Sequence, residues 1–281
     1  MRPFGLALSG GGAAGLGHIP VIEELDAAGV RPTAIAGSSI GALIGACVAA
    51  GLGGTDIRTH VTDLLSDLPG LGARLLKDAA WTDLGIGLFL DPEHILGIVL
   101  PEALPERIED LDIPFTVIAT DFYRQCEVQF TDGPLAPALA ASMAIPGVFR
   151  AVKIEDRVYV DGGVSNNLPI EALPKGLPVI AVDTVTNPPD ETEIEVLGPL
   201  MTSMGAMRIM MRALLERQLD DRPPFALLRP PSSRFGPLDF HKWADILEAA
   251  DPVRADTRRV LRELEERDAE ATGLFTGSAA D

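Results

Sequence analysis

The stretch IAGSSIGALIGACVAAGL at residues 35–52 decides the fold. It begins as an apolar strand, turns through GSSIG at residues 37–41 and continues as small apolar residues typical of a buried helix. A G-x-S-x-G sequence between a strand and a helix holds its serine on a sharp turn, with the hydroxyl exposed above a sheet. Gly37 and Gly41 allow the tight turn and the close packing of helix on strand. Ser39 is therefore the candidate nucleophile, beside a helix N-terminus that favours negative charge.

The same stretch has two other interpretations. One is a glycine-rich turn whose serine has no chemical role, because a chain with 28 glycines can contain this motif by chance. The other is a membrane span, because no charged residue occurs between Pro32 and Thr55. The glycines and the turn inside this segment favour a buried strand followed by a buried helix over a span.

The composition indicates one large domain with ample apolar material for a core, since 47% of the 281 residues are hydrophobic. The net charge of −18 and the lack of a basic cluster exclude nucleic acid as a partner. Any contact with lipid is expected to be transient and to use apolar side chains or a local cationic patch. Cys47 and Cys126 have no metal-binding spacing and the N-terminus is unlike a signal peptide, which predicts a cytoplasmic protein, at most peripheral at a membrane.

A second glycine-rich segment, SGGGAAG at residues 9–15, follows a short apolar strand expected at residues 4–9. The helix after it should begin near His18 or Ile19, because Pro20 is tolerated only in a first turn. A dinucleotide-binding turn would need an acidic residue at the end of the second strand, and a P-loop would need Gly-Lys-Ser/Thr; both are missing. The remaining interpretation is an oxyanion hole made of free backbone N–H groups beside Ser39. Its candidate donors are Gly10, Gly11 and Gly12, and Gly15 supports the turn.

The remaining chain is predicted to mix strands and helices in one domain over residues 1–272. Strands are expected at residues 34–37, 113–120, 127–130 and 179–183, with a hairpin at 148–155 and 157–160. Helices are expected at residues 56–66, 72–80, 92–99, 135–144, 200–219 and 241–266. Residues 55–110 are interpreted as an inserted helical cap, residues 198–272 as a C-terminal helical region and residues 273–281 as a disordered tail.

Methionines recur at every third position of the helix expected at residues 200–219. They are Met201, Met204, Met207 and Met210. A methionine stripe of this kind is expected to fill the core, and a flexible face that contacts lipid or a partner is the alternative.

Asp161 is the candidate partner of Ser39. It lies between a predicted strand and Gly162-Gly163, on a turn that other backbone can approach closely. An ionised carboxylate within hydrogen-bond distance can accept the serine proton directly. Because a carboxylate is a weak base, the developing oxyanion must be stabilised elsewhere, for which the glycine loop and the helix dipole are available. The alternative is that Asp-Gly-Gly is only a turn.

Together, SGGGAAG, GSSIG and DGG at residues 161–163 resemble the patatin-like phospholipase family in their order and spacing. The resemblance runs from about Leu6 to Thr184 and includes ATD at residues 119–121 and ASMAIP at residues 141–146. It implies a three-layer α/β/α fold with a mostly parallel central sheet. It also implies that Ser39 is the nucleophile, Asp161 the general base, and Gly10, Gly11 and Gly12 the oxyanion donors.

Members of this family cleave carboxylic esters of phospholipids, lysophospholipids or neutral acyl lipids, in the bacterial type without a metal or another cofactor. The resemblance therefore implies a serine esterase of phospholipase A type. Ala14 departs from the pattern, because the family commonly has Arg or Lys there, and this puts a phospholipid preference in question. Pro20 stands where the family usually has glycine, and no resemblance extends beyond about Pro188.

Three alternative functions stay open. An α/β-hydrolase-type esterase with a Ser-His-Asp triad would use one of the four histidines, His18, His60, His94 or His241, and Ser39, Asp161 and His241 occur in the required order. A non-catalytic acyl- or lipid-binding protein on the same fold is favoured by the missing basic residue at Ala14. A nucleotide-binding protein has only the glycine loop in its favour.

Overall fold

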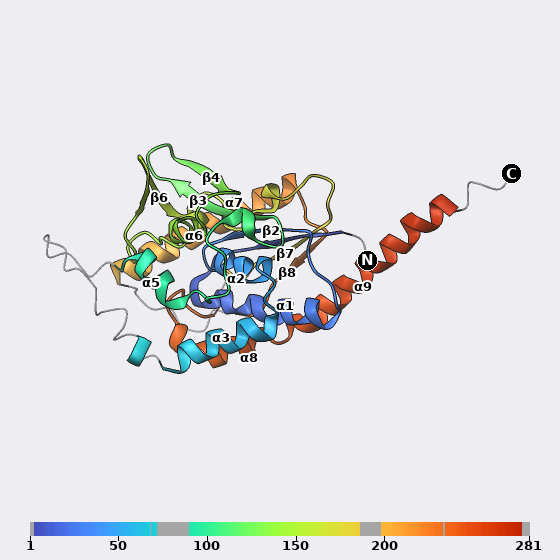
Figure 1. The fold of residues 1–281 in the computed structure, drawn as a ribbon, viewed down its shortest axis with the longest axis horizontal. Coiled ribbons are helices and arrows are strands. Elements are labelled where there is room, and N and C mark those ends of the chain that lie inside the picture. Colours follow the sequence, from blue (N-terminus) through green and yellow to red (C-terminus); the bar gives the residue numbers. More distant parts are fainter. Residues whose placement is uncertain (1–2, 68, 72–89, 186–197, 233, 277–281) are drawn as a thin grey trace, which may run out of the picture.

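A central sheet with helices on both faces forms the core of the protein (Figure 1). The computed structural model describes residues 3–67, 69–71, 90–185, 198–232 and 234–276. The strands of the sheet lie in the order β5-β6-β3-β2-β1-β7-β8, and β4 also pairs with β3. Their bounds are β1 Gly5–Leu8, β2 Ala34–Ser38, β3 Phe115–Asp121, β4 Cys126–Phe130, β5 Val152–Ile154, β6 Arg157–Asp161, β7 Val179–Val182 and β8 Ala226–Leu228.

The strands from β3 through β2, β1 and β7 to β8 run parallel, whereas β4, β5 and β6 add antiparallel pairs at one side. This confirms the mostly parallel sheet that the sequence predicts. Parallel neighbours bring all their carboxyl ends to one edge, so the turns after β1, β2 and β7 lie next to one another. Those turns contain the glycine loop, Ser39 and residues 183–185, respectively.

The described α-helices before residue 222 lie close to their predicted ranges, and the short 3₁₀ turns were not predicted. The α-helices are α1 His18–Ala27, α2 Ile40–Ala49, α3 Gly54–Ser66, α5 Pro92–Val99, α6 Leu135–Ser142, α7 Pro199–Asp221, α8 Trp243–Ala250 and α9 Val253–Thr276. The 3₁₀ turns are η1 Gly12–Gly17, η2 Ile108–Asp110, η3 Gly162–Val164, η4 Ile170–Ala172 and η5 Phe240–Lys242. As predicted from Pro20, α1 begins at His18 and holds the proline in its first turn.

The two faces of the sheet pack against different layers, which makes the three-layer α/β/α architecture. On β1, Leu6 and Leu8 face the large core beneath α1, α2 and α3, whereas Ala7 faces the opposite layer. Ala7 and the small residues beside it form a shallow surface on which Leu215 of α7 packs. Figure 1 shows α7 on one side of the sheet and α1, α3, α8 and α9 on the other. The alternation follows from the two-residue period of a strand.

In the C-terminal region one sequence-based prediction is wrong, one strand was not expected, and one helix is longer than expected. The single helix expected at residues 241–266 is divided into η5, α8 and α9, because Pro252 has no N–H to continue α8. The short strand β8, which pairs with β7, was not expected from the sequence. Helix α9 continues to Thr276, past the point where the disordered tail was expected to begin at residue 273.

The methionine stripe of α7 is not a uniform core face. Met204 of the stripe is buried, whereas Met201 is 43% and Met210 60% exposed. Met211, which lies outside the stripe, is buried as well. Methionines at every third position drift around a helix with 3.6 residues per turn, so one row cannot stay on one face. Among the described residues, no helix is both long and apolar enough to cross a membrane.

The region interpreted as a cap contains α3 and α5, at the expected positions. The helix expected at residues 72–80 and the apolar residues from Trp81 to Phe89 lie outside the described residues, as does the loop expected from Pro188 to Glu195. Whether the insert closes over the sheet edge as a cap stays a prediction.

Helix α9 is attached to α1 by a cluster of charged side chains. Arg254 is only 23% exposed and pairs with Glu23, with Glu24 at 3.3 Å and with Asp251 at 2.7 Å. Arg58 of α3 approaches the same Glu23 carboxylate to 2.6 Å. The cluster therefore joins three helices beneath the sheet.

We expect Arg254→Ala to lower the free energy of unfolding by about 2 kcal/mol, because it removes charged hydrogen bonds from partly buried carboxylates. Urea denaturation at low salt measures the change. Arg259→Ala is the matched control: Arg259 pairs with Asp256, both side chains are more than half exposed, and its removal should cost less than about 0.5 kcal/mol. Equal effects of the two substitutions would contradict this role of the cluster.

Candidate active site

Ser39 occupies a strained turn between β2 and α2. Its backbone has φ 53° and ψ −126°, a conformation that non-glycine residues rarely adopt, and the residue is 4% exposed. The backbone N–H of Ser39 donates to Ser142 Oγ at 2.8 Å, which holds the turn from the side of α6. The geometry is that of the predicted nucleophile elbow.

The two flanking glycines are needed because other backbone lies against them. A Cβ on Gly41 would overlap the carbonyl oxygens of Leu8 and Ser9 at the end of β1, and one on Gly37 would come within 2.5 Å of the Gly41 carbonyl oxygen. No real side chain fits at such distances. The first turn of α2 is therefore pressed directly onto the end of β1, which brings the glycine loop next to Ser39.

Asp161 comes to lie near Ser39 at the end of β6, a strand that runs antiparallel to β3. Strand β6 is antiparallel to β3 and ends with Asp161 level with Ala119, one residue beyond the pair formed by Ser38 and Ile118. Its backbone is fixed on both sides, since Asp161 N donates to Ala144 O at 3.0 Å and Thr120 Oγ1 donates to Asp161 O at 2.9 Å. The carboxyl group is 3% exposed. Asp161 thus enters the site as the last residue of an antiparallel strand.

The Asp161 carboxyl faces Ser39. Burial raises the pKa of Asp161 to about 6, while hydrogen bonds from the Ser39 hydroxyl and from the Gly163 N–H act in the opposite direction. Gly163 N donates to Oδ1 at 2.7 Å. The other oxygen, Oδ2, has no hydrogen-bond partner of regular geometry within the described part of the chain. The structure therefore brings the predicted serine and carboxylate together, with the carboxylate more basic than an exposed one.

The glycine loop lies beside Ser39 as predicted, but its three glycines are not equivalent. The N–H of Gly10 donates to Asn167 O at 3.1 Å and is therefore not free to bind an oxyanion. No described carbonyl or side chain accepts from the N–H groups of Gly11 and Gly12. Gly12 has φ 55°, and a Cβ there would overlap the Pro237 carbonyl oxygen. The candidate oxyanion donors are thus Gly11 and Gly12, and Gly10 positions the loop instead.

The remaining predicted glycines and Ala14 fill tight contacts. A Cβ on Gly15 would overlap the Ile40 side chain, and one on Gly162 would overlap the Ile118 carbonyl oxygen. A Cβ on Gly163 would come within 3.0 Å of Asp161 Oδ1. Ala14 is 3% exposed and lies inside η1. All these positions therefore support the backbone of the site.

His18, His60 and His241 have contacts or positions away from the Ser39 hydroxyl and the Asp161 carboxyl group. His18 Nε2 bonds the Ser9 carbonyl oxygen at 2.9 Å, and burial lowers the pKa of this imidazole to about 4. His60 Nε2 bonds the Val99 carbonyl oxygen at 2.8 Å, and His241 lies exposed in η5. Within the described residues no hydrogen bond joins an imidazole to Ser39 or Asp161. The geometry favours a two-residue arrangement over a triad.

An apolar cavity of about 370 Å³ opens beside Ser39. Gly12 and Ser39 lie in its wall, and the rest is formed mainly by apolar side chains of α2, α3 and α5 and of residues 143–149 and 237–240. His60 also reaches it, with its Nε2 engaged by a carbonyl. A cavity of this size and character accommodates a hydrocarbon chain attached to a group at Ser39.

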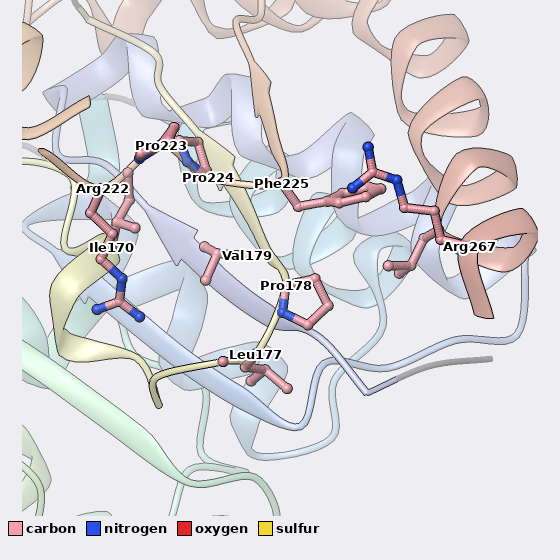
Figure 2. Close-up of a pocket in the computed structure, with 11 residues that line it drawn as sticks. Ile170, Leu177, Pro178, Val179, Arg222, Pro223, Pro224, Phe225 and Arg267 are labelled. Carbon is pink, nitrogen blue, oxygen red and sulfur yellow. The ribbon is translucent and has the colours of Figure 1, made fainter. Parts of the chain in front are cut away.

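A second cavity, of about 380 Å³, lies far from these residues (Figure 2). It is lined by Pro178 and Val179 at the amino end of β7, by Arg222 and by Phe225, over whose ring the Arg267 guanidinium lies at 4.9 Å. Because Ser39 follows the carboxyl end of the parallel strand β2, this cavity is at the opposite edge of the sheet. It contributes nothing to the candidate site.

Sequence reasoning missed two residues of the site. Ser142 was part of the recognised ASMAIP segment but had no assigned role, and it accepts the hydrogen bond from Ser39 N. Asn167 was not singled out, although its carbonyl fixes Gly10. Both are joined to the site by contacts between residues more than a hundred positions apart, and a single sequence gives no signal for such contacts.

Fold and site together define an α/β/α protein with a serine elbow at the carboxyl edge of its sheet and a carboxylate facing the serine. Comparison with known proteins agrees: the family model described as patatin-like phospholipase matches residues 6–174. The chain belongs to the patatin-like phospholipase family.

Several relatives carry the same segment. An uncharacterized NTE family protein of Mycobacterium tuberculosis is 41% identical over 59% of this chain and 44% of its own length. The lysophospholipase NTE1 of Kluyveromyces lactis is 24% identical, over 100% of this chain and 21% of its own length. Among solved structures, VipD from Legionella pneumophila aligns with a TM-score of 0.50 and 14% identity over 92% of this chain and 67% of its own, which supports the fold alone. The chain thus spans less than half the length of these sequence relatives.

The pKa of Asp161 predicts how the reactivity of Ser39 depends on pH. A carboxylic acid must be ionised to act as a base, so with Asp161 as the candidate base, labelling of Ser39 by a fluorophosphonate should be half-maximal near pH 6, where the pKa lies. The labelling rate should fall about tenfold per pH unit below it. The rate of adduct formation, followed by intact-protein mass spectrometry between pH 4.5 and 8.5, measures this. A labelling rate that does not change with pH would contradict the assignment of Asp161 as the base. So would a labelling rate that changes near pH 7 in the wild type but not in a His→Gln variant.

Proposed function

We propose that this protein is a lipid acyl hydrolase that cleaves carboxylic esters by a Ser39–Asp161 dyad through an acyl-enzyme. The observation that carries the proposal is a strained serine that faces a buried carboxylate of raised pKa and lines an apolar cavity, beside a glycine loop with two unengaged backbone N–H groups. Membership in the patatin-like phospholipase family supports it. So does the similarity to a protein named lysophospholipase.

In the proposed cycle, the Asp161 carboxylate takes the proton of the Ser39 hydroxyl as Ser39 Oγ attacks the acyl carbon. The N–H groups of Gly11 and Gly12 and the N-terminus of α2 stabilise the oxyanion. When the ester bond breaks, Asp161 returns the proton to the leaving alkoxide, and the alcohol or lysolipid departs. Asp161 then takes a proton from water, whose oxygen attacks the acyl carbon. The fatty acid is released, and the proton returns to Ser39.

The dyad predicts that hydrolysis depends on Ser39 and Asp161 and on none of the four histidines. Ser39→Ala and Asp161→Asn should each abolish hydrolysis of p-nitrophenyl butyrate, with thermal melting curves near that of the wild type. His18→Gln, His60→Gln, His94→Gln and His241→Gln should each keep most of the activity, whereas a triad enzyme would lose about four orders of magnitude in one of them. An active Asp161→Asn variant would falsify the dyad.

We assign the cavity beside Ser39 to the acyl chain of the substrate, because its lining is almost entirely apolar. The charged or polar part of a lipid would then stay outside. A buried Ala14 in the glycine loop supplies no cation for a phosphate headgroup. Neutral acyl esters therefore suit this site at least as well as phospholipids or lysophospholipids, both of which carry a phosphate headgroup.

Filling this cavity should select against long acyl chains. In Leu43→Trp, whose side chain lines the cavity, kcat/KM for p-nitrophenyl dodecanoate should fall at least about tenfold, against less than about threefold for the acetate. Leu214→Trp is the matched control, because Leu214 lies half-exposed on α7 and does not line the cavity. An equal loss for both esters in Leu43→Trp would show that the cavity does not hold the acyl chain.

We further propose that the exposed apolar face of α7 makes the transient contact with a lipid surface. Ile209 is 72% and Met210 60% exposed, and Met211 on the other side of the helix packs against Gly163, next to Asp161. From residue 199 to residue 215, α7 carries two arginines and no carboxylate, in a chain with a net charge of −18. A lipid surface therefore suits this face better than the rest of the protein does.

Vesicle co-sedimentation tests this contact. The protein should bind phosphatidylcholine vesicles, and the double variant Ile209→Asp/Met210→Asp should lose binding while it keeps hydrolysis of p-nitrophenyl butyrate. Arg259→Asp, on α9, changes the net charge by the same amount and should bind like the wild type. Unchanged binding of the double variant would exclude the α7 face, and a concentration-dependent dimer lost in that variant would assign the face to a second copy instead.

A further inference from the structure

The amide of Asn167 is buried beside the candidate dyad with neither of its polar atoms paired. Asn167 follows η3 and is 5% exposed. Its backbone oxygen accepts from Gly10 N at 3.1 Å, but its side-chain Oδ1 and Nδ2 have no hydrogen-bond partner among the described groups. A buried amide without hydrogen-bond partners destabilises the folded protein, so its presence at this place calls for an explanation.

The position of this amide is fixed by two glycines of the site. Asn167 Oδ1 lies 2.7 Å and Ser39 Cβ 3.1 Å from the point that a Cβ on Gly10 would occupy. The same Oδ1 lies 2.9 Å from the corresponding point on Gly163, and Asp161 Oδ1 lies 3.0 Å from it. The amide of Asn167 thus lies close to the glycine loop, to Ser39 and to Asp161.

The unpaired atoms of this cluster match one water molecule. Asn167 offers one donor and one acceptor, and the amide keeps both whichever way it is turned. In the acyl-enzyme, where Ser39 Oγ has no proton to donate, Asp161 Oδ2 adds a second acceptor. A water can donate to both acceptors and accept from the amide N–H at once. An oxyanion only accepts, so it would leave the amide oxygen unpaired.

We propose that Asn167 is a further catalytic residue, which holds the water that hydrolyses the acyl-enzyme. This rests on the proposed acyl-enzyme mechanism. The amide orients the water so that one O–H points at Asp161, which takes that proton as the water oxygen bonds to the acyl carbon. The bond from the acyl carbon to Ser39 Oγ then breaks, the proton passes from Asp161 to Ser39 Oγ, and the carboxylic acid leaves.

This role predicts that the two halves of the cycle respond differently to substitution. In Asn167→Ala, release of p-nitrophenolate from p-nitrophenyl butyrate in a single turnover should stay within about threefold of the wild type. Hydrolysis of the acyl-enzyme should slow at least about tenfold, because its water is no longer positioned. Acylated Ser39 should therefore accumulate and be visible by mass spectrometry of the quenched protein.

Asn166→Ala is the matched control. Asn166 is the neighbouring residue of the same type, and its Nδ2 donates to Glu127 Oε2 at 2.9 Å, outside the dyad. Both steps should be unchanged in this variant. Asn167→Ser, whose hydroxyl can donate and accept, should recover part of the deacylation rate, and Asn167→Leu, similar in size to asparagine, replaces the alanine variant if that one does not fold.

The outcomes separate this inference from the mechanism on which it rests. A joint decline of both steps in folded Asn167 variants would overturn the water-holding role, as would deacylation unchanged from the wild type. A product ratio between butyrate and methyl butyrate in added methanol that changes with the leaving alcohol of the ester would instead overturn the acyl-enzyme itself, because a common intermediate must give one ratio.

Discussion

The contact on which the site depends is the packing of the first turn of α2 against the end of β1. Gly41 lies so close to the carbonyl oxygens of Leu8 and Ser9 that no side chain fits there. This contact fixes the distance between the glycine loop and Ser39, and the backbone strain at Ser39 is held in place by the surrounding structure. Because of it, Gly10 of the glycine loop lies directly beside the Ser39 side chain. The glycine loop and the serine turn are thus held together by one packing contact.

The carboxylate is supplied by a different kind of element. Strand β6 runs against the parallel strands and stops at Asp161, where Gly162 lets the chain turn against the Ile118 carbonyl. Hydrogen bonds through Thr120 and Ala144 hold the Asp161 backbone from two sides. Because this placement buries the carboxyl group, its pKa rises, and a weak base becomes a stronger one. Burial also leaves polar atoms of Asp161 and Asn167 unpaired in one place, a pattern that suits a reacting water better than a purely structural role.

The distribution of apolar surface is consistent with a substrate that is partly lipid. The cavity at Ser39 is lined by α2, α3 and α5, on the large-core side of the sheet. The exposed side chains of α7 are on the other side, where the small residues of the strands make a shallow bed for Leu215. The two surfaces therefore serve different purposes in the proposed function: one holds an acyl chain, and the other meets a lipid surface. The division follows from the alternation of large and small residues along β1, β2 and β7.

The sequence by itself determined the strand–turn–helix at Ser39 and the start of α1 before Pro20, because both rest on local periodicity and on glycine and proline positions. The mostly parallel sheet followed from the resemblance of the motifs to a known family. The sequence also predicted Asp161 as the partner of Ser39, from the order of the motifs. The break of the helix expected at residues 241–266 was a local signal that the prediction missed, because Pro252 is visible in the sequence. Only the tertiary structure decided that the Gly10 N–H is bonded by the Asn167 carbonyl and that Ser142 holds the turn at Ser39. These contacts join residues far apart in the chain, and no local pattern encodes them, because they arise only when α6 and the segment after β6 reach the edge of the sheet where β1 and β2 end.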